Sequence, residues 1–221
     1  MVVPLLNEAV TLPQLLQDLR QCEADELVLV DGGSSDKTQQ ILQESGLRWL
    51  TSGPGRGAQM NTGARVCESE IILFLHADTV ISSSHIGILR ELAAEPAYMG
   101  GRFDVRLSGA HLALRVIEWF INLRSRLSSI STGDQAMFVR RDVFKTMGGF
   151  SDIPLMEDID LARRLKRLGK VACLPQKVCT SSRRWEQHGF VRTVLLMWRM
   201  RLLYWLGVSP AKLAAMYREA R

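Results

Sequence analysis

The chain has 221 residues, of which 47% are hydrophobic, and this is enough for one sizeable core in a single domain. The formal net charge of +5 suits anionic ligands such as nucleotides, or an anionic membrane surface. It does not predict a nucleic-acid partner, because the lysines and arginines form neither a run nor a patch interleaved with aromatic residues.

Three sequence features bear on the compartment. No window of about 18 uncharged apolar residues occurs, so no transmembrane helix is expected. The N-terminus has no basic segment followed by an apolar one, so no signal peptide is expected. The cysteines at 22, 67, 173 and 179 have neither C-x-x-C spacing nor a zinc-ligand pattern, and we expect free thiols. We therefore predict a cytoplasmic protein.

The first 80 residues alternate short apolar runs with amphipathic stretches. Strands are expected at 2–3, 27–30, 48–50 and 71–75, and helices from Thr11, at 37–44 and at 58–67. The run 71–75 is apolar at every position, which is typical of a strand buried on both faces. This βαβαβαβ order predicts a parallel, doubly wound sheet.

After residue 80 the pattern becomes mixed. Strands are expected at 99–107, 136–139, 171–174 and 177–180, with polar loops at 131–135 and 154–157. Helices are expected at 86–94, 112–127, 141–147, 158–168 and 190–206, and a last one begins at Ser209-Pro210. We predict one α/β domain with a mostly parallel central sheet flanked by helices and with a helical C-terminal tail.

Four polar clusters interrupt the apolar pattern: Asn7-Glu8, Asp31 with its loop, His76-Ala77-Asp78, and Glu157-Asp158. The first three follow successive predicted strands, so their loops should meet at one edge of the sheet, where nucleotides bind. Each cluster alone is also explained as a turn or a helix cap. Two familiar phosphate motifs are excluded, because 53–57 lacks the Gly-Lys-Ser/Thr of a P-loop and Gly32-Gly33 does not complete G-x-G-x-x-G.

Several short motifs together make a family resemblance. They are Pro4-Leu5-Leu6-Asn7-Glu8, Val30-Asp31-Gly32-Gly33-Ser34-Ser35-Asp36-Lys37-Thr38, Gly55-Arg56-Gly57-Ala58-Gln59-Met60-Asn61-Thr62-Gly63-Ala64, Phe74-Leu75-His76-Ala77-Asp78-Thr79, Gly133-Asp134-Gln135 and Met156-Glu157-Asp158. In this order and spacing the sequence resembles the family-2 glycosyltransferases of GT-A fold over nearly its whole length. It looks closest to a branch of small bacterial enzymes, some of them linked to arsenosugar or carotenoid-type glycosylation.

The resemblance implies a metal-dependent, inverting transfer of a sugar from a nucleotide-sugar, most often a UDP-sugar, to an acceptor hydroxyl. The implied nucleotide contacts are Pro4, Asn7, Glu8, Asp31, Gly33, Asp36, Arg56 and His76. Asp78 matches the last carboxylate of the family's DxD motif and would bind Mn²⁺ or Mg²⁺, which prefer hard oxygen ligands. Asp158 matches the general base, with Glu157 beside it.

The sequence departs from the family pattern at two places. His76 stands at the first position of the DxD motif, so a bound ion would have one carboxylate fewer and the metal preference is open. Processive relatives carry Gln-x-x-Arg-Trp, whereas here Ser181 precedes Arg184-Trp185, which predicts a single-transfer enzyme. Arg184 is then expected near the diphosphate and Trp185 near the acceptor; a surface basic residue beside a packed tryptophan is the alternative.

Residues Gly133, Asp134 and Gln135 are expected to line the acceptor side, with a plain turn as the alternative. The division of the chain would then be 1–80 for nucleotide binding, 81–189 for the acceptor and catalysis, and 190–221 for an amphipathic tail. The basic amphipathic helix 190–206 suits packing against the domain, a homodimer interface, or peripheral contact with the inner face of a membrane.

Two rival functions remain open. A nucleotidyltransferase shares this type of fold, but it should have a glycine-rich basic loop after the first strand, and Pro4 to Glu8 offers none. A non-catalytic nucleotide-sugar sensor would keep UDP binding without turnover.

Overall fold

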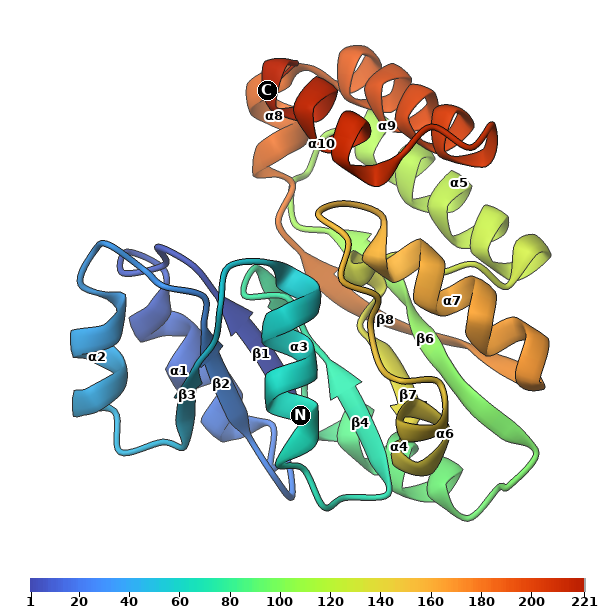
Figure 1. The fold of residues 1–221 in the computed structure, drawn as a ribbon. Helices are drawn as coiled ribbons and strands as arrows, with labels where there is room; N and C mark the ends of the chain where they lie inside the picture. The colour runs from blue at the N-terminus through green and yellow to red at the C-terminus, as the bar shows by residue number, and fades with distance from the viewer. Residues whose placement is uncertain (221) are drawn as a thin grey trace.

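The computed structural model describes residues 1–220, in which one eight-stranded sheet is flanked by helices (Figure 1). The strands are β1 Val2–Leu5, β2 Val28–Asp31, β3 Trp49–Thr51, β4 Ile71–Phe74, β5 Thr79–Val80, β6 Tyr98–Leu107, β7 Met137–Arg140 and β8 Lys170–Thr180. The helices are α1 Leu12–Gln21, α2 Thr38–Glu44, α3 Arg56–Arg65, α4 Ser83–Ala93, α5 Leu112–Ser128, α6 Arg141–Thr146, α7 Glu157–Leu168, α8 Arg183–His188, α9 Phe190–Trp205 and α10 Pro210–Glu219.

The sheet has the order β3-β2-β1-β4-β7-β6-β8-β5. Strands β1 to β4 are parallel to one another, as predicted from the βαβ pattern. The short β7 runs antiparallel between β4 and β6, and β8 is again parallel to β6. Six strands therefore end at the same edge, and the predicted α/β class with a mostly parallel sheet is confirmed.

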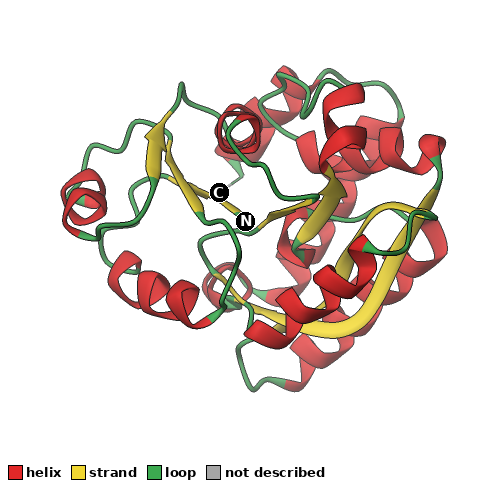
Figure 2. Ribbon diagram, turned by 90° about the horizontal axis from the view of Figure 1, so that it is seen from below, coloured by secondary structure: helices red, strands yellow, loops and turns green. Residues whose placement is uncertain are grey.

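Two apolar layers cover the two faces of the sheet, with helices on either side (Figure 2). In β4, Leu73 packs on the side of α1 and α4, whereas Ile72 and Phe74 pack on the side of α3, α6 and α7. Alternate side chains of a strand point to opposite faces, so a strand buried on both faces needs an unbroken apolar run. This explains the sequence pattern of 71–75.

Helix α3 lies very close to the sheet because Gly63 faces β1. A Cβ at this position would come within 2.4 Å of the Val2 side chain. A side chain of α3 also binds the strand backbone: the Gln59 Nε2 donates to the carbonyls of Leu5 (2.7 Å) and Val30 (2.9 Å), at the ends of β1 and β2. The glycine and the glutamine of this motif thus fix the helix against the strand ends.

Helix α5 is attached to the part of β6 that extends beyond the short β7. The Asn122 side chain accepts from Val105 N (2.9 Å) and donates to Val105 O (3.0 Å), as a neighbouring strand would. The buried Glu118 accepts from Leu107 N (2.5 Å). Helix α5 therefore takes the place of a strand at this point, because the free backbone groups of β6 need partners.

Three elements differ from the sequence prediction. The expected strands 171–174 and 177–180 form one strand, β8, whose pairing with β6 is irregular at Pro175-Gln176. Proline cannot donate to the ladder, so it is tolerated at such a bulge. The two-residue strand β5 and the six-residue helix α8 were not predicted. Short elements carry too few residues to show a periodicity.

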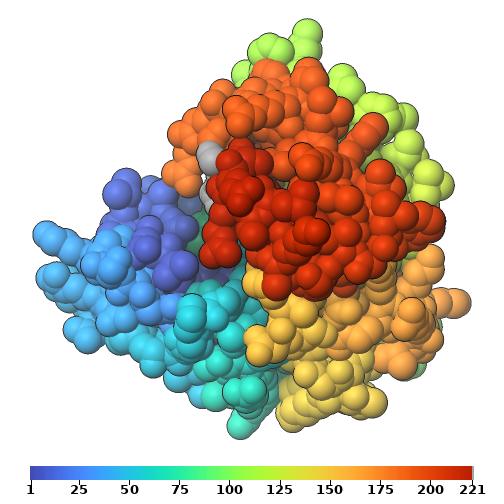
Figure 3. All heavy atoms as spheres, turned by 45° about the horizontal axis from the view of Figure 1, so that its top comes forward, coloured from blue at the N-terminus to red at the C-terminus, as the bar shows by residue number. Residues whose placement is uncertain are grey.

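The C-terminal helices pack on the second half of the sheet, and Figure 3 shows them on the outer surface in orange and red. One side of α9 packs against α5 through Phe190, Val194 and Met197, and another packs against α7 and α10. Within residues 1–220, no helix is both long and apolar enough to cross a bilayer. The division at residues 80 and 189 stays a prediction; β5, at the first boundary, pairs with β8 of the second part.

Candidate active site

The predicted site residues come together because of the strand directions. The loops after β1, β2, β4 and β8 leave the sheet at the same edge. Strand β7 runs the other way, and its first residue, Met137, pairs with Phe74 at the end of β4. The 3-10 turn η1 (Gly133–Gln135) therefore lies beside the segment 76–78, although the two are far apart in sequence.

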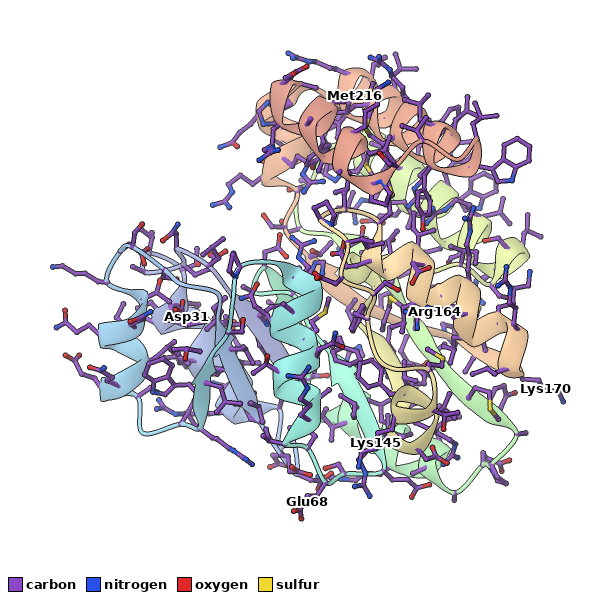
Figure 4. All side chains as sticks on the ribbon, viewed as in Figure 1. Asp31, Glu68, Lys145, Arg164, Lys170 and Met216 are labelled. Carbon is purple, nitrogen blue, oxygen red and sulfur yellow. The ribbon has the colours of Figure 1, made fainter. Side chains whose placement is uncertain are left out.

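Asp31 ends β2 and has no exposed surface (labelled in Figure 4). Its carboxylate accepts from Gly33 N and Ser34 N (both 3.1 Å), the Ser34 hydroxyl, and Gln39 Nε2 (2.6 Å). Burial raises the pKa of Asp31, but the hydrogen bonds from Ser34 and Gln39 outweigh it and hold the pKa below its ordinary value. The carboxylate is therefore ionised, and it shapes the loop after β2.

The loops after β1 and β2 are tied together by side-chain hydrogen bonds. The Asn7 Oδ1 accepts from Ser35 N (2.8 Å), and Asn7 adopts a left-handed conformation with φ 54°. Asp36 accepts from Ala9 N (3.1 Å) and Thr38 N (2.9 Å). Asn7 and Asp36 thus build the double loop, and the half-buried Glu8 and the exposed Gly33 lie at its surface.

Arg56 and Glu157 link the two halves of the site. Arg56 begins α3, Glu157 begins α7, and the Arg56 Nη1 lies 3.7 Å from the Glu157 Oε1. Glu157 is buried, whereas the Arg56 side chain is half exposed. A second link is Asn61 of α3, whose amide donates to Phe150 O and accepts from Phe150 N, both at 2.8 Å.

His76 follows β4, and its imidazole lies directly against Gly133. A Cβ at Gly133 would lie 2.2 Å from the His76 Nε2, so no side chain fits there. Burial lowers the pKa of His76 well below its usual range, and the positive charges of Arg56 and Arg184 lower it further. The imidazole is therefore neutral, and two cations lie near it.

Asp78 is exposed, and its carbonyl accepts from Ser181 N (3.0 Å), which holds the end of β8 beside it. Among residues 1–220, no group of three or more acidic, histidine or cysteine side chains could hold a metal ion. A complete protein-made metal site is therefore not present in this part of the chain. A single exposed carboxylate fits Mg²⁺ or Mn²⁺ when substrate phosphates and water supply the other oxygen ligands.

Asp158 lies in the first turn of α7 and is half-buried. Its Oδ2 accepts from Gly133 N (2.9 Å) and its Oδ1 from Ile159 N (2.7 Å). Burial raises the pKa of Asp158 to about 6, and the neighbouring Glu157 carboxylate also raises it. A carboxylate with this pKa is mostly ionised at pH 7 and still binds protons, as a general base requires. Met156, just before α7, is left-handed with φ 71°.

Arg124 of α5 is a candidate that the sequence analysis missed. The Gln135 Nε2 donates to the Ser125 hydroxyl (3.0 Å), which places η1 beside the end of α5 next to Arg124. Burial lowers the pKa of Arg124, whereas the carboxylates of Asp134 and Asp158 oppose that change. The Arg124 Nη2 and the Asp134 Oδ1 are both buried without a hydrogen-bond partner within residues 1–220. Such groups are costly unless a ligand or water completes them.

Of three further residues predicted for acceptor or diphosphate contact, two are buried and one is exposed. Gln135 is fully buried and its amide is used by Ser125 and Thr132, so it holds the turn. Trp185 is buried in the apolar cluster between β6, α5 and α9, so the alternative of a packed tryptophan is the one the structure has. Arg184 is exposed, with its guanidinium 5.9 Å from the centre of the Tyr217 ring.

The fold is that of the GT-A class of glycosyltransferases. Among solved structures, residues 1–349 of Staphylococcus aureus TarS superpose with a TM-score of 0.63 at 20% identity, covering 82% of this chain and 59% of that one. Glucosyl-3-phosphoglycerate synthase of Mycobacterium tuberculosis, in complex with Mn²⁺, UDP-glucose and phosphoglyceric acid, superposes with a TM-score of 0.59 at 18% identity over 80% of this chain and 68% of that one.

Within that class, the chain belongs to glycosyl transferase family 2, whose family model matches residues 1–148. Curated relatives include the PGL/p-HBAD biosynthesis glycosyltransferases of Mycobacterium bovis and Mycobacterium tuberculosis, which are 29% identical over 163 residues. The match covers 68% of this chain, and the chain spans 62% of the length of those relatives. The family predicted from the motifs is confirmed.

Proposed function

We propose that the protein transfers a sugar from a nucleotide-sugar, most simply a UDP-sugar, to an acceptor hydroxyl, once per encounter and with inversion at the anomeric carbon. The observation that carries this proposal is Asp158: a half-buried carboxylate with a pKa of about 6, held by Gly133 N at the edge where the loops after β1, β2 and β4 lie. Solved relatives of the same fold with bound UDP-N-acetylglucosamine or UDP-glucose support the choice of donor.

In the proposed reaction the acceptor oxygen attacks the anomeric carbon from the face opposite the diphosphate. The carbon–oxygen bond to the diphosphate breaks, the nucleoside diphosphate leaves, and the hydroxyl proton passes to the Asp158 carboxylate. A positioned base of this kind contributes roughly a hundred- to ten-thousand-fold. Its two backbone hydrogen bonds, from Gly133 and Ile159, fix the orientation of the carboxylate before the acceptor arrives.

The leaving diphosphate would lie between Asp78 and the cations near His76. A Mn²⁺ or Mg²⁺ ion held by Asp78 would neutralise charge on the diphosphate. Arg56, at the first turn of α3, and Arg184, at the first turn of α8, add positive charge at the same place. The neutral His76 can donate or accept one hydrogen bond there, but it adds no charge.

The acceptor would lie on the other side of Asp158, beside Arg124 and Asp134. Two buried atoms there have no hydrogen-bond partner in the described part of the chain, the Arg124 Nη2 and the Asp134 Oδ1. They support a polar acceptor molecule that takes a hydrogen bond from the guanidinium and donates one to the carboxylate. We further propose a cytoplasmic location with peripheral contact at the inner membrane face; the free cysteines support a reducing compartment. The alternative role of the same C-terminal helices is to form the interface of a homodimer.

The test is hydrolysis of UDP-glucose and UDP-N-acetylglucosamine with Mn²⁺ or Mg²⁺ present. We expect the wild type and an Asp152→Asn control, an exposed carboxylate on the loop before α7, to release UDP. Asp158→Asn should still bind UDP and lose activity by at least a hundredfold. Asp78→Asn should lose metal-dependent activity. If the wild type binds UDP but releases none from the UDP-sugars, the sensor function is supported instead. If UDP release needs no metal ion and is unchanged in Asp78→Asn, the proposed metal-binding role of Asp78 is refuted.

A further inference from the structure

The exposed apolar side chains of the protein are gathered on two neighbouring helices. Of the fifteen large apolar residues that are exposed within residues 1–220, eleven lie on α5 and α9 or at their ends. They are Leu112, Val116, Trp119, Phe120, Leu127, Val191, Leu195, Trp198, Leu202, Trp205 and Leu206. We call these eleven residues the apolar face. Such a concentration is unusual for a surface that only meets water, because exposed apolar residues are normally scattered.

The apolar face is one surface because α5 and α9 pack side by side. Phe190, Val194 and Met197 of α9 pack on the cluster that contains Leu114 and Ile117 of α5. The exposed residues of α9 recur every three or four positions, from Val191 to Trp205, and so form a stripe along the helix. In Figure 3, α5, in yellow-green, borders the orange and red C-terminal helices at the rim of the molecule.

The charge around the apolar face is positive. No acidic residue occurs between Glu186 and Glu219, a segment that contains four arginines and one lysine. The only acidic residue of α5, Glu118, is buried and paired with Arg115. An exposed apolar stripe with tryptophans and with arginines but no carboxylates is the composition of a helix lying in the interface of an anionic membrane.

A basic hollow adjoins one end of the apolar face. It has a volume of about 600 Å³ and is lined by Ile130, Arg163, Lys166, Arg167 and Trp205. Trp205 belongs to both features, so the hollow opens beside the stripe of α9. No carboxylate lines the hollow, and its three cations come from α7. A phosphate headgroup is complementary to such a place, since it brings the negative charge that the lining lacks.

We propose that the apolar face and the basic hollow together dock the protein on a bilayer that contains anionic phospholipids. A second copy of the chain is a poorer occupant, because a two-fold interface would bring two copies of the same basic surface, without acidic residues between 186 and 219, against each other. A bilayer with anionic headgroups buries the apolar stripe and neutralises the arginines at once. This inference gives the membrane contact proposed above its residues and its lipid class, and it does not depend on the proposed glycosyl transfer.

The experiment is vesicle flotation of the full chain, with tryptophan fluorescence as a second readout. Vesicles are made of phosphatidylcholine alone, or with a quarter of phosphatidylglycerol. We expect at least about tenfold tighter binding to the anionic vesicles, weakened by salt, with a blue shift of the emission as the tryptophans of the face leave water. Equal binding to both vesicles, or none to the anionic ones, overturns the proposal.

Variants separate the face from the rest of the surface. Trp198→Glu with Leu202→Glu should abolish binding, whereas Val10→Glu, at an exposed apolar residue before α1 and outside the apolar face, should leave it unchanged. Neutralising the three hollow cations to glutamine should weaken binding on the order of a hundredfold. Melting curves and UDP binding report the folding of each variant. The proposal is overturned if the double variant of the apolar face binds vesicles as well as the wild type does. It is also overturned if the wild type binds no vesicles but forms a dimer, and the double variant is a monomer.

Discussion

Replacing Asp158 by asparagine is predicted to stabilise the protein at neutral and alkaline pH while it removes activity. The pKa of this carboxyl is raised from 3.8 to about 6, which means that the folded protein disfavours the ionised form. A shift of this size corresponds to about 3 kcal/mol once the group is fully ionised. Asparagine carries no charge and so avoids that cost. It keeps one oxygen for two backbone donors, and the lost hydrogen bond costs about 1 kcal/mol.

The sign of the pH dependence follows from the direction of the shift. Because the pKa is higher in the folded state than in the unfolded state, folding takes up protons between 3.8 and about 6. The penalty is absent below pH 3.8, grows as the pH rises through this window, and is complete above about pH 6. We therefore expect Asp158→Asn to gain about 2 kcal/mol over the wild type at alkaline pH, and to be slightly less stable than the wild type in acid.

The assay is thermal unfolding without ligand, followed by circular dichroism between about pH 4 and pH 8. A gain of about 2 kcal/mol raises the Tm of a chain of this size by roughly 4–8 °C. The exposed Asp152→Asn serves as the control and should show no such pH-dependent difference. A variant that melts at or below the wild-type temperature across the whole range would refute the assignment of a raised pKa to Asp158, and with it the argument for a base.

Four further outcomes are expected. The acidic limb of kcat/KM for donor turnover should fall with an apparent pKa near 6, so that the rate drops roughly tenfold one pH unit below it; a limb near pH 4 would contradict this. Gly133→Ala should displace His76 and cost about 1–3 kcal/mol together with most of the activity, whereas Gly46→Ala, in an open turn, should affect stability only. Arg124→Met should keep UDP binding and donor hydrolysis but lose transfer to acceptors; equal losses in both assays would show a structural role instead. Asn61→Ala should lower the unfolding free energy by about 2–3 kcal/mol, measured by urea unfolding, because two buried backbone groups lose their partners.

The motifs predicted the parallel half of the fold and the edge at which the site lies, because strand ends and apolar runs are local signals. The run 71–75 was an unambiguous strand, and the loops after it could be placed by the rule for parallel sheets. The antiparallel β7 was predicted as a strand at 136–139, but nothing local showed that it would pair with β4 and bring Gly133 to His76.

The direction of side chains from irregular segments could not be predicted. The pair Arg184-Trp185 was expected near the diphosphate and the acceptor because of its sequence alone. The direction of the indole, which points into the apolar core, is set by α8, and this helix is too short to be predicted from a periodic pattern. Arg124 looked like one of several arginines on an amphipathic helix. Arg124 lies beside Asp134 because the Gln135 side chain binds the Ser125 hydroxyl. This contact joins α5 to the turn η1 and could not be predicted from the sequence.

The ion pair between Arg56 and Glu157 has a consequence for how donor and proton binding are coupled. Glu157 raises the pKa of Asp158, and Arg56, 3.7 Å from the Glu157 carboxylate, offsets part of its charge. A diphosphate that draws Arg56 away would leave Glu157 less neutralised and would bring its own negative charge. The proton affinity of Asp158 would then rise on donor binding, and by linkage the donor would bind more weakly as the pH increases. The pair thus makes the base and the donor thermodynamically interdependent before any acceptor arrives.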